Sequence, residues 1–188
     1  MNPKTIVERC RMNNIKRGML AFSVAVILSA CATPARVDQM TVAPTAVTVP
    51  EALRQNVAIK DVTGGQDTNP LWTSQVSSAE FERALESSLQ GANLLQANRQ
   101  AGRFTLTAQL GKLDQPFIGL SMTVTASVLY MLVERSTGQT IWQDTIVTPY
   151  TASFGDALLG IERLKLANEG AVRSNIAALI EKLVRLKV

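Results

Sequence analysis

Polar and apolar residues alternate in four stretches of the chain, which is the pattern of half-buried β-strands. These stretches are residues 56–62, 104–110, 120–134 and 140 to about 148. The polar residues 135–139 between the last two stretches predict a hairpin loop, and Pro149 is expected to end the fourth strand. The sequence therefore predicts a mostly antiparallel sheet of about four strands.

The third of these strands becomes apolar on both faces in its second half. Its even-numbered positions from 122 to 132 are apolar throughout. Its odd-numbered positions are polar up to Ser127 and then apolar at Leu129, Met131 and Val133. We expect this half of the strand either to be covered on both faces or to meet a partner there.

Two other stretches place apolar residues three and four positions apart, the period of an amphipathic helix. The first spans about 78–90 and follows Ser77, with Glu80 at the spacing of a capping box. The second is expected to begin at Asp156 as its N-cap, to run toward the C-terminus and to break at Gly170. This element order predicts an α/β (α+β) two-layer sandwich, in which two helices, the C-terminal one long, pack on the sheet.

The second helix also carries a polar set beside its apolar stripe. Asn168 lies on the stripe, so we expect its amide to bond to a neighbouring backbone group. Glu169 and Arg173 are four positions apart, and this spacing predicts an ion pair on the helix surface.

An uncharged apolar segment, residues 20–28, follows the basic pair Lys16-Arg17 near the start of the chain. It is too short to span a bilayer, which takes about 20 helical residues, and it has the form of the central region of an export signal. Residues 1–30 are therefore predicted to be a signal peptide. Initiation at Met12 would give a more compact basic leader, so we expect Met12 to be the true start.

The signal ends in Leu28-Ser29-Ala30-Cys31, which resembles the lipobox of bacterial lipoproteins. The resemblance implies cleavage between Ala30 and Cys31, a diacylglycerol on the Cys31 thiol and an acyl chain on the new N-terminus. Such acyl chains would anchor the protein to a membrane. In lipoproteins of this kind the absence of an aspartate after the cysteine favours the outer membrane, facing the periplasm. The alternative is an ordinary secretory signal in which Cys31 is incidental.

The exported chain divides into a linker and one domain. Residues 31–55 contain Pro34, Pro44 and Pro50 among small residues, which predicts an extended tether beyond the lipid. Residues 42–49 alternate enough to form an edge strand instead. Residues 56–188 are expected to form a single periplasmic α/β domain.

Processing removes the basic character of the chain. The sequence has 19 basic and 15 acidic residues, and five basic residues and one acid precede Cys31, which leaves 14 of each. The mature chain therefore has no net charge, and we expect no nucleic-acid partner.

The chain contains no histidine, and Cys31 is the sole cysteine of the mature protein. Histidine-dependent triads and histidine metal sites are thereby excluded, and the acids are scattered over separate elements. We expect no enzymatic activity, no metal site and no cofactor beyond the covalent lipid.

Two turn-rich loops, Thr63 to Trp72 and Asp114 to Gly119, are the expected partner-binding surfaces. Trp72 is a candidate aromatic anchor for a partner, although the sequence favours the alternative in which its ring folds back to cap the core. The candidate contact residues are Gly64, Gly65, Trp72, Asp114 and Phe117.

In element order, residues 56–184 are similar to small periplasmic α/β lipoproteins. Among these are the lipopolysaccharide-assembly lipoprotein and the lipoprotein activators of cell-wall synthases. The resemblance implies a non-enzymatic accessory that docks onto an envelope protein complex. One alternative is a carrier that shields an apolar ligand, such as a lipid, with Met122, Leu129, Met131 and Trp142. Another is a purely structural envelope protein.

The lipobox predicts that Cys31→Ala abolishes incorporation of labelled palmitate, because the acceptor thiol is lost. Cys10→Ala is the control, since Cys10 is absent from the mature protein whether translation starts at Met1 or at Met12, and the change should leave labelling unchanged. Labelling that persists in Cys31→Ala would contradict the lipobox. Labelling is measured on the immunoprecipitated protein after growth with radioactive palmitate.

Overall fold

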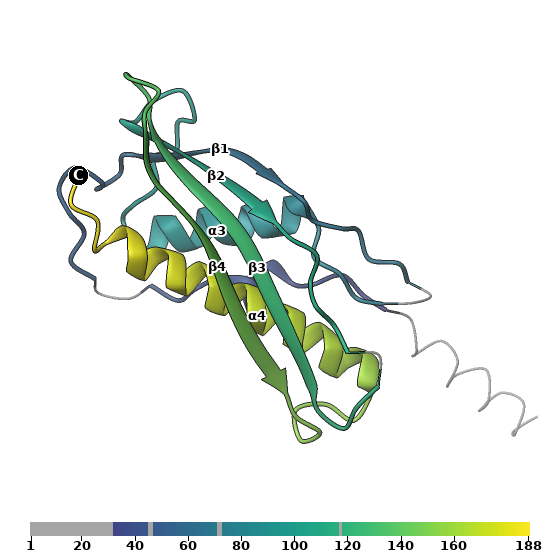
Figure 1. The fold of residues 1–188 in the computed structure, drawn as a ribbon. Coiled ribbons are helices and arrows are strands. Elements are labelled where there is room, and N and C mark those ends of the chain that lie inside the picture. The colour runs from purple at the N-terminus through teal and green to yellow at the C-terminus, as the bar shows by residue number, and fades with distance from the viewer. Residues whose placement is uncertain (1–31, 45–46, 71–72, 117) are drawn as a thin grey trace, which may run out of the picture. The chain divides into compact units, whose positions relative to one another are not determined.

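The computed structural model describes residues 32–44, 47–70, 73–116 and 118–188 (Figure 1). The expectations for Ala30, Cys31, Trp72 and Phe117 lie outside the described residues. The elements in chain order are α2 (Val37–Met40), β1 (Val57–Thr63), α3 (Ser78–Gly91), β2 (Phe104–Leu110), β3 (Met122–Glu134), β4 (Thr140–Ala152) and α4 (Gly160–Leu183).

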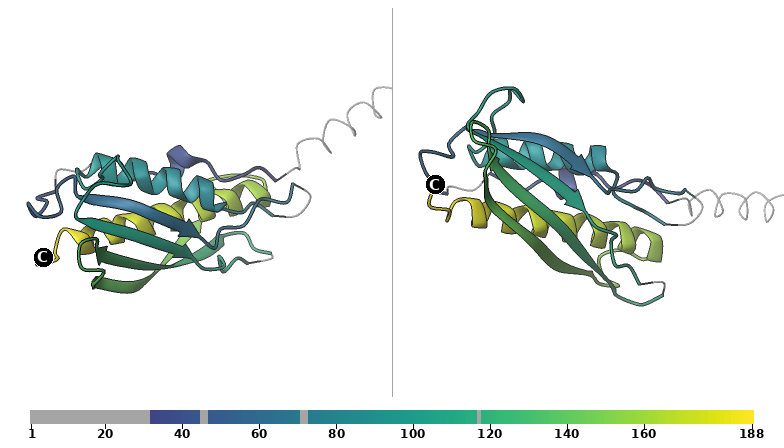
Figure 2. Two further views of the ribbon diagram at one scale, coloured as in Figure 1. Left: turned by 90° about the horizontal axis from the view of Figure 1, so that it is seen from above. Right: turned by 45° about the horizontal axis from the view of Figure 1, so that its top comes forward.

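The four strands form one mixed sheet in the order β1-β2-β3-β4. β1 and β2 are parallel and are connected through α3, whereas β2, β3 and β4 are antiparallel to their neighbours. Figures 1 and 2 show α3 and α4 on the same face of this sheet. The α+β class, the mostly antiparallel sheet and the long C-terminal helix are confirmed.

The core lies between the sheet and the two long helices. The even-numbered residues of β3 face it, and the outward residues Leu129, Met131 and Val133 are only half-buried. The largest fully buried side chains include Phe81, Leu85 and Leu89 of α3, Phe104 and Leu106 of β2, Tyr130 and Leu132 of β3 and Ile176 of α4.

A buried amide fixes α4 over the sheet. Asn175 Nδ2 donates to the carbonyl oxygen of Ile146 at 2.8 Å and to Thr148 Oγ1 at 3.1 Å. Its Oδ1 accepts the hydroxyl proton of Tyr130 at 2.9 Å. Burial raises the pKa of Tyr130 well above its ordinary value, so the ring stays a neutral donor. These bonds set the position of α4 along β3 and β4, because sliding the helix would leave buried polar groups unpaired.

The capping box at the start of α3 is present as predicted. Ser77 Oγ accepts from the Glu80 backbone nitrogen at 3.2 Å, and the Glu80 carboxylate accepts from the Ser77 backbone nitrogen at 2.9 Å. Local side-chain chemistry therefore determines where this helix begins.

The expected tether is wrong for the described part of residues 32–55. Ala35, Met40, Val49 and Leu53 are buried in the main core, and α2 contacts both α3 and α4. The prolines restrict the backbone but do not prevent an extended segment from packing. Its isolated apolar residues have no period that the sequence pattern would reveal, and the expected edge strand at 42–49 is likewise not formed by its described residues.

β4 continues through Pro149 to Ala152, which corrects the expected end of this strand. Opposite Pro149, Thr125 uses its backbone N–H and carbonyl to bond Asp114 on the β2 side. Pro149 therefore sits in a non-hydrogen-bonded pair of an edge strand, where its missing N–H would have faced away from the sheet.

The long helix α4 differs from the expectation at two positions. It begins at Gly160 with Leu159 as N-cap, while Asp156 instead accepts bonds from Ser153 in the preceding turn. Gly170 does not break the helix. Its missing side chain gives room to the Tyr150 ring of β4, since a Cβ at this position would lie 2.3 Å from Tyr150 Cδ1.

We expect Gly170→Ala to lower the stability of the protein by about 1–3 kcal/mol, because the added methyl group overlaps the Tyr150 ring. The free energy of unfolding in urea measures this loss. Gly155→Ala is the control, because its new Cβ would only touch Ser153 Oγ at 3.9 Å. Equal stability of the two variants would contradict the packing role of Gly170.

Candidate functional site

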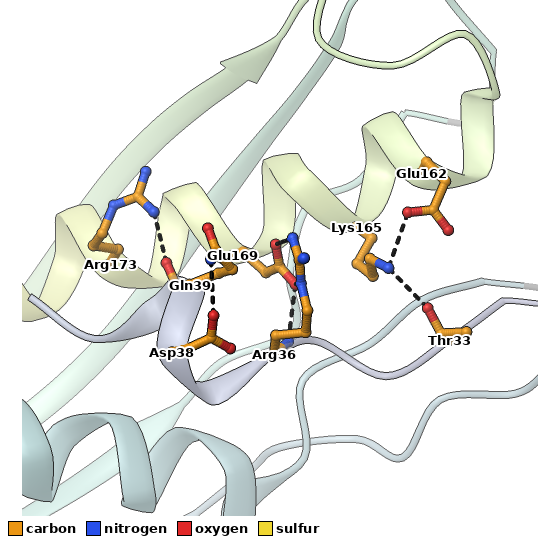
Figure 3. A network of polar contacts seen from close by, with 8 residues as sticks. All are labelled: Thr33, Arg36, Asp38, Gln39, Glu162, Lys165, Glu169 and Arg173. Atoms are coloured by element: carbon orange, nitrogen blue, oxygen red, sulfur yellow. Dashed lines mark hydrogen bonds and ion pairs between the residues drawn. The ribbon is translucent and has the colours of Figure 1, made fainter.

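The N-terminal segment, residues 32–41, is fastened to α4 by a buried carboxylate (Figure 3). The Glu169 side chain is 2% exposed and accepts three bonds from Arg36. The donors are the backbone nitrogen at 2.9 Å, Nε at 3.1 Å and Nη2 at 3.1 Å. The hydrogen bond with Glu169 raises the pKa of Arg36 above its ordinary value, so the guanidinium stays charged.

Two further cations on the same face of α4 hold this segment. Lys165 Nζ donates to Thr33 Oγ1 at 2.9 Å and pairs with Glu162 at 2.9 Å. Arg173 Nη1 donates to the carbonyl oxygen of Gln39 at 2.6 Å. The expected pair between Glu169 and Arg173 is therefore wrong, because each side chain finds a partner on the N-terminal segment instead.

These contacts fix the place where the chain enters the folded body. The Ala32 backbone nitrogen donates to the carbonyl oxygen of Pro70 at 2.8 Å, and Thr33 is held by Lys165 in the second turn of α4.

Ser74 and Gln75, which follow the first expected loop, meet Gln115 of the second expected loop over α4. Gln115 Nε2 donates to the carbonyl oxygen of Ser74 at 3.1 Å and to Asn168 Oδ1 at 2.9 Å. Asn168 Nδ2 donates to the same Ser74 oxygen at 2.9 Å, which confirms its expected backbone bond. Gln75 Nε2 adds a contact with Gln115 Oε1 at 3.3 Å. Ser74, Gln75 and Gln115 thus form one polar junction with Asn168 of α4, which we call the loop junction.

The glycines of the first loop have a packing role. Gly64 has φ +86°, and a Cβ there would lie 2.0 Å from the carbonyl oxygen of Leu110. A Cβ on Gly65 would lie 2.2 Å from the backbone nitrogen of Ser78. These close approaches let the loop pass between β2 and the start of α3. Asp114 is exposed, with its backbone paired to Thr125.

Sequence reasoning missed a group of exposed apolar residues at the same end of the molecule. Ile118 is 92% exposed, Leu158 80% and Leu120 75%, and Phe154 and Leu159 are about half exposed. We call these five residues the apolar loop patch. The exposure of Leu158 and Leu159 was not predicted, because a helix starting at Asp156 would have included both leucines. The only sequence signal was their position beside a glycine-containing turn.

Arg163 holds the two loops of the patch together. Its Nη1 donates to the carbonyl oxygens of Ala157 at 2.7 Å and Leu158 at 2.9 Å, and its Nη2 reaches that of Gly119 at 3.3 Å. Its guanidinium also lies 5.3 Å from the centre of the Phe154 ring. The buried cation thus supports both loops from behind.

The residues proposed for an apolar carrier do not line one cavity. Tyr130 of β3 faces α4, so its neighbours Leu129 and Met131 point to the opposite face of the sheet. Met122 lies on the helix side, as does Trp142, which pairs with Leu132. A surface pocket of about 490 Å³ near the hairpin end is lined mainly by the amides of Gln55, Gln90, Asn93 and Gln96.

Within residues 32–188, apart from the gaps named above, the acids form no group of three that would hold a metal ion. In the same part of the chain, each helix is too short or too polar to cross a bilayer.

Comparison with known proteins shows the fold. No family model and no curated protein matches the chain. Among solved structures, it is similar to a Xanthomonas campestris protein of family DUF330, at 13% identity, with 74% of this chain and 92% of that chain covered and a TM-score of 0.51. The chain shares the fold of that protein.

Two further solved structures match with lower TM-scores. One is the PelC dodecamer from Paraburkholderia phytofirmans, at 16% identity, with 74% of this chain and 96% of that chain covered and a TM-score of 0.49. The other is a Caulobacter crescentus protein provisionally described as a lipoprotein, at 11% identity, with coverage of 71% and 90% and a TM-score of 0.46.

We expect Glu169→Ala to release the N-terminal segment and to cost about 2–3 kcal/mol, because the charged hydrogen bonds of Arg36 are lost. Urea unfolding measures the cost, and faster trypsin cleavage after Arg36 reports the release. Glu181→Ala is the control on the same helix, since Glu181 forms only an exposed pair with Arg185. Unchanged cleavage in Glu169→Ala would contradict the fastening role.

Proposed function

We propose that the protein is a lipid-anchored lipoprotein of the outer membrane, facing the periplasm, which acts as a non-enzymatic docking module of an envelope complex. The observation that carries the proposal is the fastening of residues 32–41 to α4, immediately after the lipobox cysteine. Without a free tether at this point, acyl chains on Cys31 would hold the folded body itself at the membrane surface.

This arrangement would orient the molecule. The start of α4 and the loop junction would face the membrane, while the β3–β4 hairpin and the C-terminus would face the periplasm (Figure 1). A fixed orientation favours docking, because fewer rotational states are lost when a partner binds. Confinement to a membrane also raises the effective concentration of a partner held in the same membrane.

The described acids support a non-enzymatic role. The carboxyls of Asp38, Glu134, Asp144 and Asp156 each have a lowered pKa, caused chiefly by a hydrogen bond from a neighbouring group. A general acid that works near neutral pH needs a raised carboxyl pKa instead. Together with the absence of histidine from the sequence, this pattern favours structural hydrogen bonding, in two cases to a cation, over catalysis.

The partner surface that we propose lies next to the loop junction. It comprises the exposed loop 63–70 with Gly64 and Gly65 at its start, together with Asp114; Trp72 and Phe117 remain proposed contacts from the sequence. Because this junction lies where the chain enters the body, the partner is expected to be an envelope protein at the same membrane.

A photo-crosslinking residue at Asp67 tests the docking surface in cells. We expect it to capture a defined envelope protein in the lipidated wild type, and to lose that product in the Cys31→Ala background. The same probe at Thr137, in the opposite hairpin, is the matched control and should not capture this protein. The same products at both positions, or an empty result at Asp67 while palmitate still labels the protein, would contradict docking at this loop.

A further inference from the structure

We propose that the apolar loop patch inserts into the interface of the lipid bilayer beside the lipid anchor and gives the folded body a second attachment. The proposal rests on the proposed lipidation of Cys31. It assigns a lipid surface as the binding partner of Ile118, Leu120, Phe154, Leu158 and Leu159.

The first observation is the exposure of these side chains. Ile118, Leu120 and Leu158 each keep at least three quarters of their surface open to solvent, although residues close to them in the sequence, such as Leu113 and Met122, are buried in the core. Single exposed apolar residues are ordinary, but five large ones in two adjoining loops form a patch of the kind that marks an interaction site.

The second observation is that the patch is built rather than loose. Arg163 bonds to the backbone of both loops and lies over the Phe154 ring, and it is itself only 6% exposed. The loop backbones are thus held from the protein side, so the exposed side chains need little ordering before they enter a bilayer. Asp156, an exposed carboxylate in the second loop, accepts two hydrogen bonds from Ser153, which hold its charge against the loop's own polar groups.

The third observation is the position of the patch relative to the chain entry. Arg163 supports the patch, and Lys165, two residues later on α4, holds Thr33. These two residues lie about 3 Å apart along the helix axis but on different sides of the helix, so they place the patch and the chain entry at the same end of α4 rather than side by side. Figure 1 shows the β2–β3 and β4–α4 loops at the end where α4 begins, opposite the C-terminus. Acyl chains on Cys31 would therefore bring a bilayer to this end of the molecule.

The charged side chains next to the patch are compatible with a lipid bilayer as its binding partner. At the entry point Lys165 is paired with Glu162, and Arg163 is buried with both Nη atoms bonded to backbone carbonyls, while its buried Nε has no hydrogen-bond partner. No like-charged cluster of described residues has to be desolvated when the patch approaches the headgroups. Aliphatic and aromatic side chains on a polar turn are the composition that favours interfacial insertion.

The test uses the full chain, processed in cells and reconstituted into phospholipid vesicles. Leu158→Cys carries an environment-sensitive fluorophore, and the vesicles contain a phospholipid with a quencher on the upper part of its acyl chain. We expect the emission to shift to shorter wavelength and to fall about two-fold with the quencher. Thr137→Cys in the hairpin is the control and should show neither change.

Three results would overturn the proposal, and they differ from one another. A fully acylated protein whose residue-158 probe is quenched no more than the residue-137 probe rules out the patch but leaves the anchor intact. A mature protein whose mass shows no acyl groups rules out the proposed anchor and the patch with it. A photo-crosslinker at residue 158 that captures a protein or a second copy of this chain, and no phospholipid, assigns the patch to that partner.

Discussion

The Glu169 carboxylate places a strong constraint on the rest of the molecule. It is buried under the N-terminal segment, where an unpaired negative charge would carry a large desolvation cost. Arg36 supplies both its guanidinium and its backbone nitrogen, so the segment must lie along α4 for the helix to be buried as it is. Together with the bonds from Lys165 and Arg173, this pairing determines where the chain enters the domain at Ala32.

The two ends of the domain consequently differ in chemistry. Both ends carry paired charges, but the end where the chain enters adds large exposed apolar side chains on supported loops, whereas the opposite end carries pairs such as Arg103 with Glu134 and Lys182 with Asp144. Exposed pairs of this kind contribute little to stability, but they keep the opposite end well hydrated. Such an asymmetry suits a protein that has one end at a membrane and the other in an aqueous compartment.

Periodicity predicted those parts of the fold that depend on neighbouring residues. The strands of the sheet and the start of α3 at Ser77 follow from alternation and from a capping box that spans four residues. The fastened N-terminal segment does not follow from the sequence, because Arg36 and Glu169 are 133 positions apart and neither lies in a recognisable motif. The expected helix break at Gly170 was wrong for a related reason. The glycine is needed for its close contact with the Tyr150 ring of β4, which the sequence around Gly170 does not reveal.

Pro149 has a consequence for molecules that share one membrane. β4 is an edge strand of thirteen residues, and edge strands can recruit one another into continuous sheets. Molecules anchored to one membrane in the same orientation would hold their edge strands at the same distance from the bilayer. Lateral collisions would then bring two edges into register for pairing and aggregation. Pro149 removes an outward donor from the row, so it interrupts the template at the place where crowded neighbours would otherwise join.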